Sequence, residues 1–81
     1  MGTAGKALKQ ILETYGISQN RLAVEMGISR GTVHNWVQEK KDPVAESVLA
    51  IAEGLEKINE AAAKEFLTLY LGRFAEGDAE E

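Results

Sequence analysis

The sequence contains no cysteine, one proline and one histidine, and long apolar runs are missing as well. Without cysteine the 81 residues form neither disulfides nor thiolate metal sites, which is compatible with a reducing cytoplasm. A lone histidine with no second ligand nearby is a poor metal site. No stretch approaches the roughly 20 apolar residues of a membrane helix, and no signal peptide is recognisable. We therefore expect one cytoplasmic domain without a metal, cofactor or membrane association.

The net charge of -4 conceals opposite charges in the two halves of the chain. Residues 1–41 carry six basic and three acidic side chains, whereas residues 42–81 carry three basic and ten acidic ones. Salt screens charges over about 8–10 Å, so a polyanion bound to the first half would feel mainly the local positive charge. Opposed halves are also ordinary in helical proteins. Charge alone therefore leaves nucleic-acid binding open.

Apolar residues recur at three- and four-residue steps, which predicts an all-α fold without strands. We expect helices over about 4–15, 18–26, 29–40, 44–55 and 59–74. The expected N-caps are Thr3, Ser18, Ser29 and Asn59. Gly16 and Gly27 are expected to end the first two helices. Residues 75–81 are predicted to be a disordered acidic tail, which leaves 1–74 as the domain.

One local pattern occurs twice between residues 17 and 36. An isoleucine precedes a serine N-cap, and an apolar residue follows four positions after the serine, so that each helix start carries a hydrophobic staple. The pairs are Ile17 with Leu22 and Ile28 with Val33. Only Gly27, Ile28 and Ser29 separate the two expected helices. So short a turn forces a sharp angle between them, which is typical of a helix-turn-helix.

The outward face of the helix expected at 29–40 is polar and free of carboxylates until Glu39. Side chains of this kind hydrogen-bond to base edges in the major groove. The predicted base contacts are Arg30, Gly31, Thr32, His34 and Asn35. The predicted phosphate contacts are Ser18, Gln19, Arg21, Gln38, Lys40 and Lys41. For His34 simple exposure is the alternative, and Trp36 is assigned to the core rather than to base stacking.

Over residues 6–71 the chain resembles the lambda-repressor-like DNA-binding domain of the Cro/repressor (XRE) family. The residues that carry the likeness are Ser18-Gln19, Leu22-Ala23, Met26-Gly27, Ile28-Ser29, Val33, Trp36, Pro43, Ala52 and Leu55. The resemblance implies a compact five-helix bundle that binds a near-palindromic operator as a dimer, with its third helix in the major groove. It implies that Gln19 binds phosphate and that Arg30, Gly31, Thr32 and Asn35 read bases.

The chain departs from the family pattern at three places, one of which is Gly31, where members commonly have a side chain. Many members have Glu-Asn-Gly after the position of Trp36, where this chain has Val37-Gln38-Glu39. Members often have a serine or threonine cap after Pro43, where this chain has Val44. The departure after Trp36 puts the usual backbone contact there in doubt, although Gln38 could replace it.

The helix expected at 59–74 has more apolar surface than packing on one side requires. It could simply close a small core, or it could form a homodimer interface. We predict a homodimer, with an interface formed by Phe66, Leu67, Tyr70, Leu71 and Phe74.

These patterns together predict a sequence-specific double-stranded DNA-binding regulator that represses by occupying its site. The alternative is a protein-interaction module of the same fold, such as an antitoxin or an adaptor. An enzyme is not expected, because the chain has one histidine, no cysteine, no phosphate-binding loop and no paired carboxylate site. No small-molecule substrate is evident.

Overall fold

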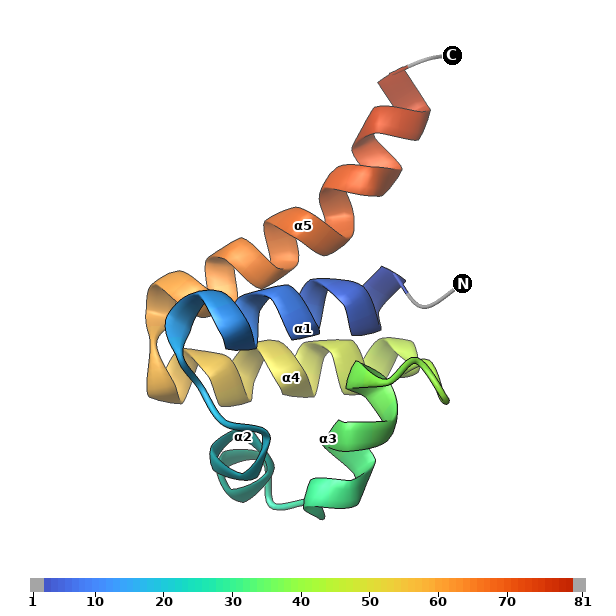
Figure 1. Ribbon diagram of the computed structural model, residues 1–81. Coiled ribbons are helices and arrows are strands. Elements are labelled where there is room, and N and C mark those ends of the chain that lie inside the picture. Colours follow the sequence, from blue (N-terminus) through green and yellow to red (C-terminus); the bar gives the residue numbers. More distant parts are fainter. Residues whose placement is uncertain (1–2, 80–81) are drawn as a thin grey trace.

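The computed structural model describes the backbone of residues 3–79 and the side chains of residues 4–72 (Figure 1). All regular structure within that range is helical, which confirms the all-α, five-helix prediction. The helices are α1 (Thr3–Tyr15), α2 (Gln19–Met26), α3 (Arg30–Val37), α4 (Ala45–Ile58) and α5 (Glu60–Ala79).

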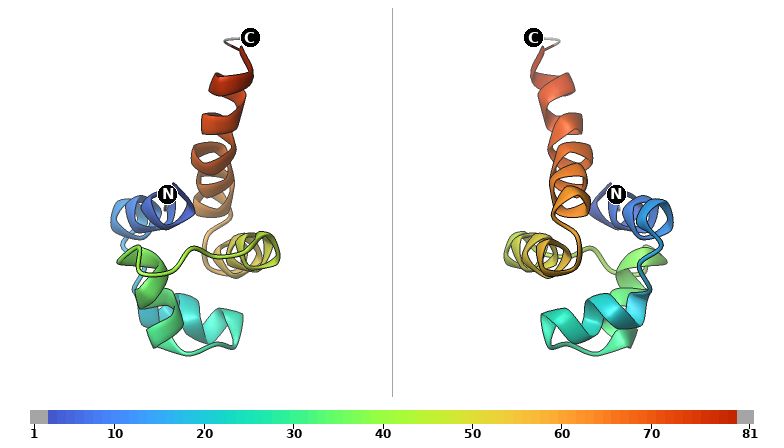
Figure 2. Two further views of the ribbon diagram at one scale, coloured as in Figure 1. Left: turned by 90° about the vertical axis from the view of Figure 1, so that its right-hand side faces the viewer. Right: turned by 90° about the vertical axis from the view of Figure 1, so that its left-hand side faces the viewer.

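The helices α2 and α3 lie at one end of the molecule and α5 leaves the body at the other, as the views in Figures 1 and 2 agree. Between them, α1 and α4 cross the middle. The helix α1 packs against α3 and α5, whereas α4 packs against α2 and α5. The pair α2–α3 is therefore supported from behind by two longer helices.

The core lies where the five helices meet, and each helix contributes buried apolar side chains to it. The largest fully buried side chains are Phe66, Leu8, Ile11, Leu22, Ile51, Leu55 and Val33. Trp36 is only 7% exposed, so its assignment to the core is confirmed.

Serine and asparagine side chains begin three of the helices as expected. Ser18 and Ser29 are the N-caps of α2 and α3, and Asn59 Oδ1 accepts hydrogen bonds from the amides of Ala61 and Ala62. Val44, by contrast, precedes α4 without any side-chain cap. Thr3, expected as an N-cap, is already part of α1.

The helices α1 and α2 end in the same way, with a glycine in the left-handed conformation followed by an isoleucine. Gly16 has φ of 65° and Gly27 of 72°. The amides of Ile17 and Ile28 donate to Leu12 O at 2.9 Å and Ala23 O at 3.0 Å. This six-to-one hydrogen bond marks a Schellman motif, whose left-handed residue is usually glycine. The prediction that these glycines end their helices is confirmed.

The helix α3 is shorter than predicted, because it ends at Val37 rather than near Lys40. Glu39 takes the left-handed conformation, with φ of 62°. Its amide donates to Trp36 O at 3.0 Å, and the amide of Lys40 donates to Asn35 O at 2.9 Å. These bonds form a third Schellman motif, with glutamate where glycine is usual. The predicted end of α3 near Lys40 was wrong, because the sequence has no glycine at the position where the helix ends.

The last two helices continue beyond their predicted ends. The helix α4 reaches Ile58, and α5 runs to Ala79. Alanine and glutamate favour the helix, which is consistent with this extension. Residues 75–79 of the predicted disordered tail are thus helical, while the division of the chain at residue 74 stays a prediction.

A close contact between α1 and α3 fixes the orientation of α3. Gly5 is buried, and a Cβ placed on it would collide with the carbonyl oxygen of Trp36. The end of α3 can therefore lie directly against the backbone of α1 only because residue 5 has no side chain.

None of the helices in the described part of the chain combines the length and the apolar character that a membrane span requires.

Candidate nucleic-acid interface

An open groove of ≈ 600 Å³ separates the first turns of α2 and α3. Its lining comes from two short segments that the turn at Gly27 brings together. They contribute Ser18, Gln19, Asn20, Arg30, Gly31 and His34. Five of these six residues were predicted to contact DNA, and the structure gathers them on one surface.

Both helix N-termini beside this groove are capped by serine. Ser18 Oγ accepts a hydrogen bond from the amide of Arg21 at 2.9 Å, and Ser29 Oγ accepts one from the amide of Thr32 at 3.3 Å. Amides earlier in each first turn have no partner within the helix, and the helix dipole makes this end positive. The arrangement favours a phosphate at the start of α2 and electron-rich base edges at the start of α3.

A side-chain hydrogen bond crosses the groove and joins the two helices. His34 Nδ1 lies 3.2 Å from Gln19 Oε1. Gln19, a predicted phosphate contact, and His34, a predicted base contact, therefore restrain each other's side chains. Sequence spacing gave no sign of this pair, because the residues lie fifteen positions apart on different helices.

Thr32 and Asn35 are half-buried and contribute less free surface than Arg30 or His34. The hydroxyl of Thr32 lies 3.0 Å from Ser29 Oγ and keeps further hydrogen-bonding capacity beside its methyl group. The carbonyl of Asn35 accepts from the amides of Lys40 at 2.9 Å and Lys41 at 3.4 Å. Asn35 thereby anchors the turn that carries both lysines.

A second groove, of ≈ 390 Å³, continues from the first toward the end of α3. Ser18, Gln19 and Gln38, all predicted phosphate contacts, line it together with Lys9 of α1. Sequence reasoning assigned no contact to Lys9. The sequence places Lys9 in the basic half of the chain. Only the packing of α1 in the structure shows that Lys9 lies beside this groove.

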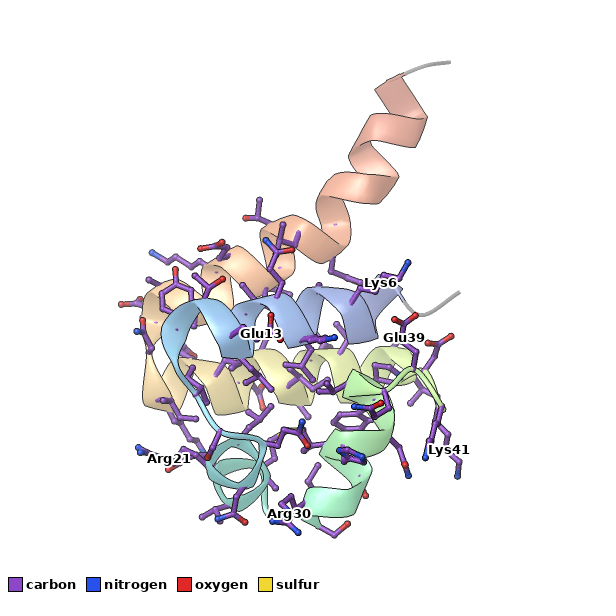
Figure 3. The ribbon with its side chains drawn as sticks, in the orientation of Figure 1. Lys6, Glu13, Arg21, Arg30, Glu39 and Lys41 are labelled. Carbon is purple, nitrogen blue, oxygen red and sulfur yellow. The ribbon has the colours of Figure 1, made fainter. Side chains whose placement is uncertain are left out.

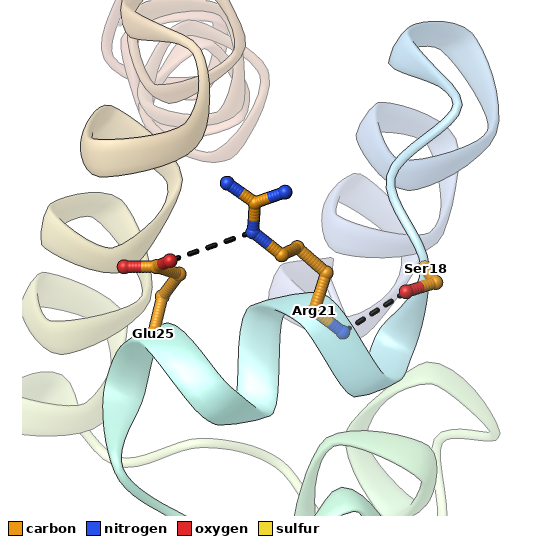
Figure 4. A network of polar contacts seen from close by, with 3 residues as sticks. All are labelled: Ser18, Arg21 and Glu25. Carbon is orange, nitrogen blue, oxygen red and sulfur yellow. Dashed lines mark hydrogen bonds and ion pairs between the residues drawn. The ribbon is translucent and has the colours of Figure 1, made fainter.

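The guanidinium of Arg21 is paired with a carboxylate of its own helix, although the backbone amide of Arg21 donates to Ser18. Its Nε is 3.4 Å from Glu25 Oε2, as Figure 4 shows, and it borders the corner formed by Tyr15, Gly16 and Asn59. Figure 3 places Arg30 at the tip of α3 and Lys41 beyond the end of that helix. The phosphate contact of Arg21 stays a prediction, as do those at the start and beyond the end of α3.

The helix-turn-helix family model matches residues 8–60, which is more than half of the chain. This protein belongs to the helix-turn-helix family. The matching family is of the Cro/repressor type, so the predicted membership is confirmed. Neither a curated protein nor a solved structure matches the chain. Members of this family bind DNA and are typically transcriptional regulators.

The helix-turn-helix protein also has an apolar groove of ≈ 270 Å³ between α4 and α5, which shares no lining residue with the groove between α2 and α3. It is lined by Ala45, Val48, Leu49, Leu67, Tyr70 and Leu71. Leu49 is 63% exposed and Leu71 is 53% exposed. Three predicted dimer residues thus line one apolar surface on the described part of the chain.

Phe66 does not belong to that surface. Its side chain is completely buried, and its ring stacks with that of Tyr70 at a centroid distance of 6.4 Å. The prediction that Phe66 contacts a second chain was wrong, because the inner side of α5 is used by the protein's own core. The side chain of Phe74 lies outside the described residues.

Proposed function

We propose that this protein is a cytoplasmic, sequence-specific transcriptional repressor that acts as a homodimer by occupying its operator. In this proposal α3 enters the major groove, where Arg30, His34 and Asn35 contact base edges. The phosphates on either side of the major groove are contacted by Ser18, Gln19, Gln38, Lys40 and Lys41. Lys9 contacts phosphate as well.

The observation that carries the proposal is the open groove between two capped helix N-termini. It places a guanidinium, an imidazole and an amide around Gly31, where no side chain fills the space. Such groups hydrogen-bond to purine edges and phosphates. The helix α5, which carries part of the acidic half of the chain, lies at the opposite end of the molecule from α2 and α3 (Figure 1).

The apolar groove between α4 and α5 supports a homodimer. Two of its lining residues, Leu49 and Leu71, have more than half of their surface exposed. A single α3 makes few base contacts, each contributing about 1–3 kcal/mol of discrimination. Two copies double the contacts and read half-sites about one helical turn apart.

Selection of bound sequences from random double-stranded DNA tests the proposal. We expect an enriched motif with two-fold symmetry. Arg30→Ala should relax base preference at one position of each half-site, and Asn35→Ala at another. Recovery of no motif would reject sequence-specific reading and favour the alternative, a protein-interaction module such as an antitoxin or adaptor.

Salt dependence separates the phosphate contacts from the base contacts. Lys41→Ala should weaken binding to all sequences and reduce the salt slope by about 1. Lys64→Ala is the matched control, because it removes the same charge from an exposed position on α5. Equal effects of both variants would show that overall charge, rather than a defined contact, controls binding.

A further inference from the structure

The contact between His34 and Gln19 determines which imidazole nitrogen carries hydrogen. Gln19 Oε1 has only lone pairs, so His34 Nδ1, 3.2 Å away, must be the donor. In a neutral imidazole one nitrogen donates and the other accepts. Neutral His34 therefore holds its hydrogen on Nδ1 and presents Nε2 as an acceptor.

The position of His34 leaves Nε2 available to a ligand in the groove. The residue is exposed on α3, and the positions three and four before it are Gly31 and Arg30, which share its face of the helix. A Cβ on Gly31 would meet only Ser29 Oγ, at 3.9 Å. No side chain at position 31 therefore stands between the imidazole and the groove.

We infer that His34 reads the edge of one base pair through Nε2, and that its protonation state selects which base it accepts. Neutral His34 accepts a hydrogen bond from an exocyclic amino group, such as N4 of cytosine or N6 of adenine. Protonated His34 donates from both nitrogens, so it keeps the bond to Gln19 and turns Nε2 toward N7 or O6 of guanine. This assignment rests on the proposed DNA binding.

The charged groups around His34 are few. Among the residues that the structure describes, Arg30, on the same helix, is the only ionisable neighbour that lines the groove. The α2 residues that face His34 are Ser18, Gln19 and Asn20, none of which titrates. From α1, Lys9 and Glu13 line the adjoining groove beyond Gln19. Among the described residues, no carboxylate lines the groove that His34 borders, and the carboxylate of the adjoining groove is that of Glu13.

Selection from random double-stranded DNA at about pH 8 and about pH 5.5 tests the inference, since these values bracket the titration of histidine. At the higher pH we expect cytosine or adenine at one position of each half-site, and guanine there at the lower pH. The change in preference should be about tenfold, the size of one direct base contact. Positions read by Arg30 and Asn35 should not change.

His34→Gln is the matched variant, because glutamine can still bond to Gln19 but does not titrate. Its motif should be identical at both pH values. A pH-dependent change that persists in His34→Gln, or a wild-type motif that does not change, would overturn the inference while leaving sequence-specific binding intact. Failure to enrich any motif at either pH would instead reject the proposed function.

Nitrogen NMR of the imidazole in the free protein gives a measurement that does not depend on DNA. At about pH 8, where histidine is neutral, we expect hydrogen on Nδ1 and a bare Nε2. Gln19→Ala should remove this preference and allow the other tautomer. Hydrogen on Nε2 in the wild type would contradict the assigned direction of the bond and overturn the inference.

Discussion

The hydroxyl of Tyr15 donates a 2.7 Å hydrogen bond to Glu65 Oε1 and so joins α1 to α5 across fifty positions of the chain. This bond to Glu65 raises the pKa of the Tyr15 hydroxyl above its usual value of 10.0, with contributions from desolvation and from the carboxylate charge. The neutral phenol is therefore the form that the folded protein favours.

We expect this contact to stabilise the fold up to alkaline pH. A raised pKa adds stability that is fully present below pH 10.0, the ordinary value. That stability is lost as the pH rises through the raised pKa in the folded state. Tyr15→Phe should lower the melting temperature by a few degrees at neutral pH, and its deficit should narrow above pH 10.0. Thermal melts of both proteins over this pH range provide the measurement.

Glu65→Gln is the control for the charge contribution. It keeps an acceptor oxygen for Tyr15 but removes the negative charge that disfavours the phenolate. Absorbance titration of the phenol should show Tyr15 ionising at lower pH in this variant than in the wild type. An unchanged titration would mean that the carboxylate does not control the pKa of Tyr15.

We expect Gly31→Ala to change protein stability and DNA affinity in opposite directions. The space around it is open, and its φ lies outside the range that only glycine favours, so Gly31→Ala should stabilise the free protein by about 0.4–1 kcal/mol. A methyl group in the groove should nevertheless weaken DNA binding, by roughly tenfold for one lost base contact. Urea unfolding and binding titrations measure the two effects.

Gly72 on α5 offers the matched control for Gly31. A Cβ there would meet nothing within 4 Å, whereas one on Gly31 would only touch Ser29 Oγ at 3.9 Å, and the φ of Gly72 is ordinary. Gly72→Ala should stabilise the protein by a similar amount without changing DNA affinity. If Gly31→Ala binds DNA as well as the wild type, the backbone at residue 31 does not approach DNA closely.

Glu39 should be replaceable with a gain in stability. A non-glycine residue in the left-handed conformation costs about 1–2 kcal/mol, and Glu39 has φ of 62°. Part of the gain from glycine is offset by its greater freedom in the unfolded chain. We expect Glu39→Gly to stabilise by about 1 kcal/mol and Glu39→Asn by less, as measured by urea unfolding.

Glu39→Ala distinguishes backbone conformation from charge. It removes the carboxylate near the negative end of the α3 dipole but keeps a Cβ in the left-handed conformation. We expect it to gain much less stability than Glu39→Gly. Equal gains from alanine and glycine would assign the effect to the charge.

The sequence predicts those parts of the fold that depend on local hydrogen bonding. Ser18, Ser29 and Gly27 act within a few residues of their own positions, so both borders of α2 and the start of α3 could be read directly. The end of α3 could not, because Glu39 closes the helix without the residue type that normally does so. Its conformation is stabilised by hydrogen bonds to Trp36 and Asn35 rather than by local preference.

The candidate site shows the same division between local and long-range information. The face containing Arg30, Gly31 and His34 follows from helical periodicity, whereas the bond from His34 to Gln19 depends on the angle between two helices. Phe66 shows why the dimer surface was only partly predictable. Apolar residues surround much of α5, and periodicity alone does not say which of them face the core.

The apolar groove between α4 and α5 leads to a prediction about oligomeric state. Leu71→Glu places a charge at a position that is 53% exposed in the single chain, so its own fold should survive. We expect light scattering to give the mass of two chains for the wild type and of one chain for this variant. Loss of the second half-site contact should reduce affinity for a two-fold operator by about 100-fold.

Val24→Glu is the control for this experiment, because Val24 is 66% exposed on α2 and lies outside the groove. Its mass should equal that of the wild type. A single-chain mass for the wild type at high concentration would contradict the dimer, and the exposed groove would then point to a different protein as partner. Because Leu71 lies far from α3, its substitution should leave affinity for an isolated half-site unchanged, and this distinguishes lost dimerisation from a damaged DNA-binding surface.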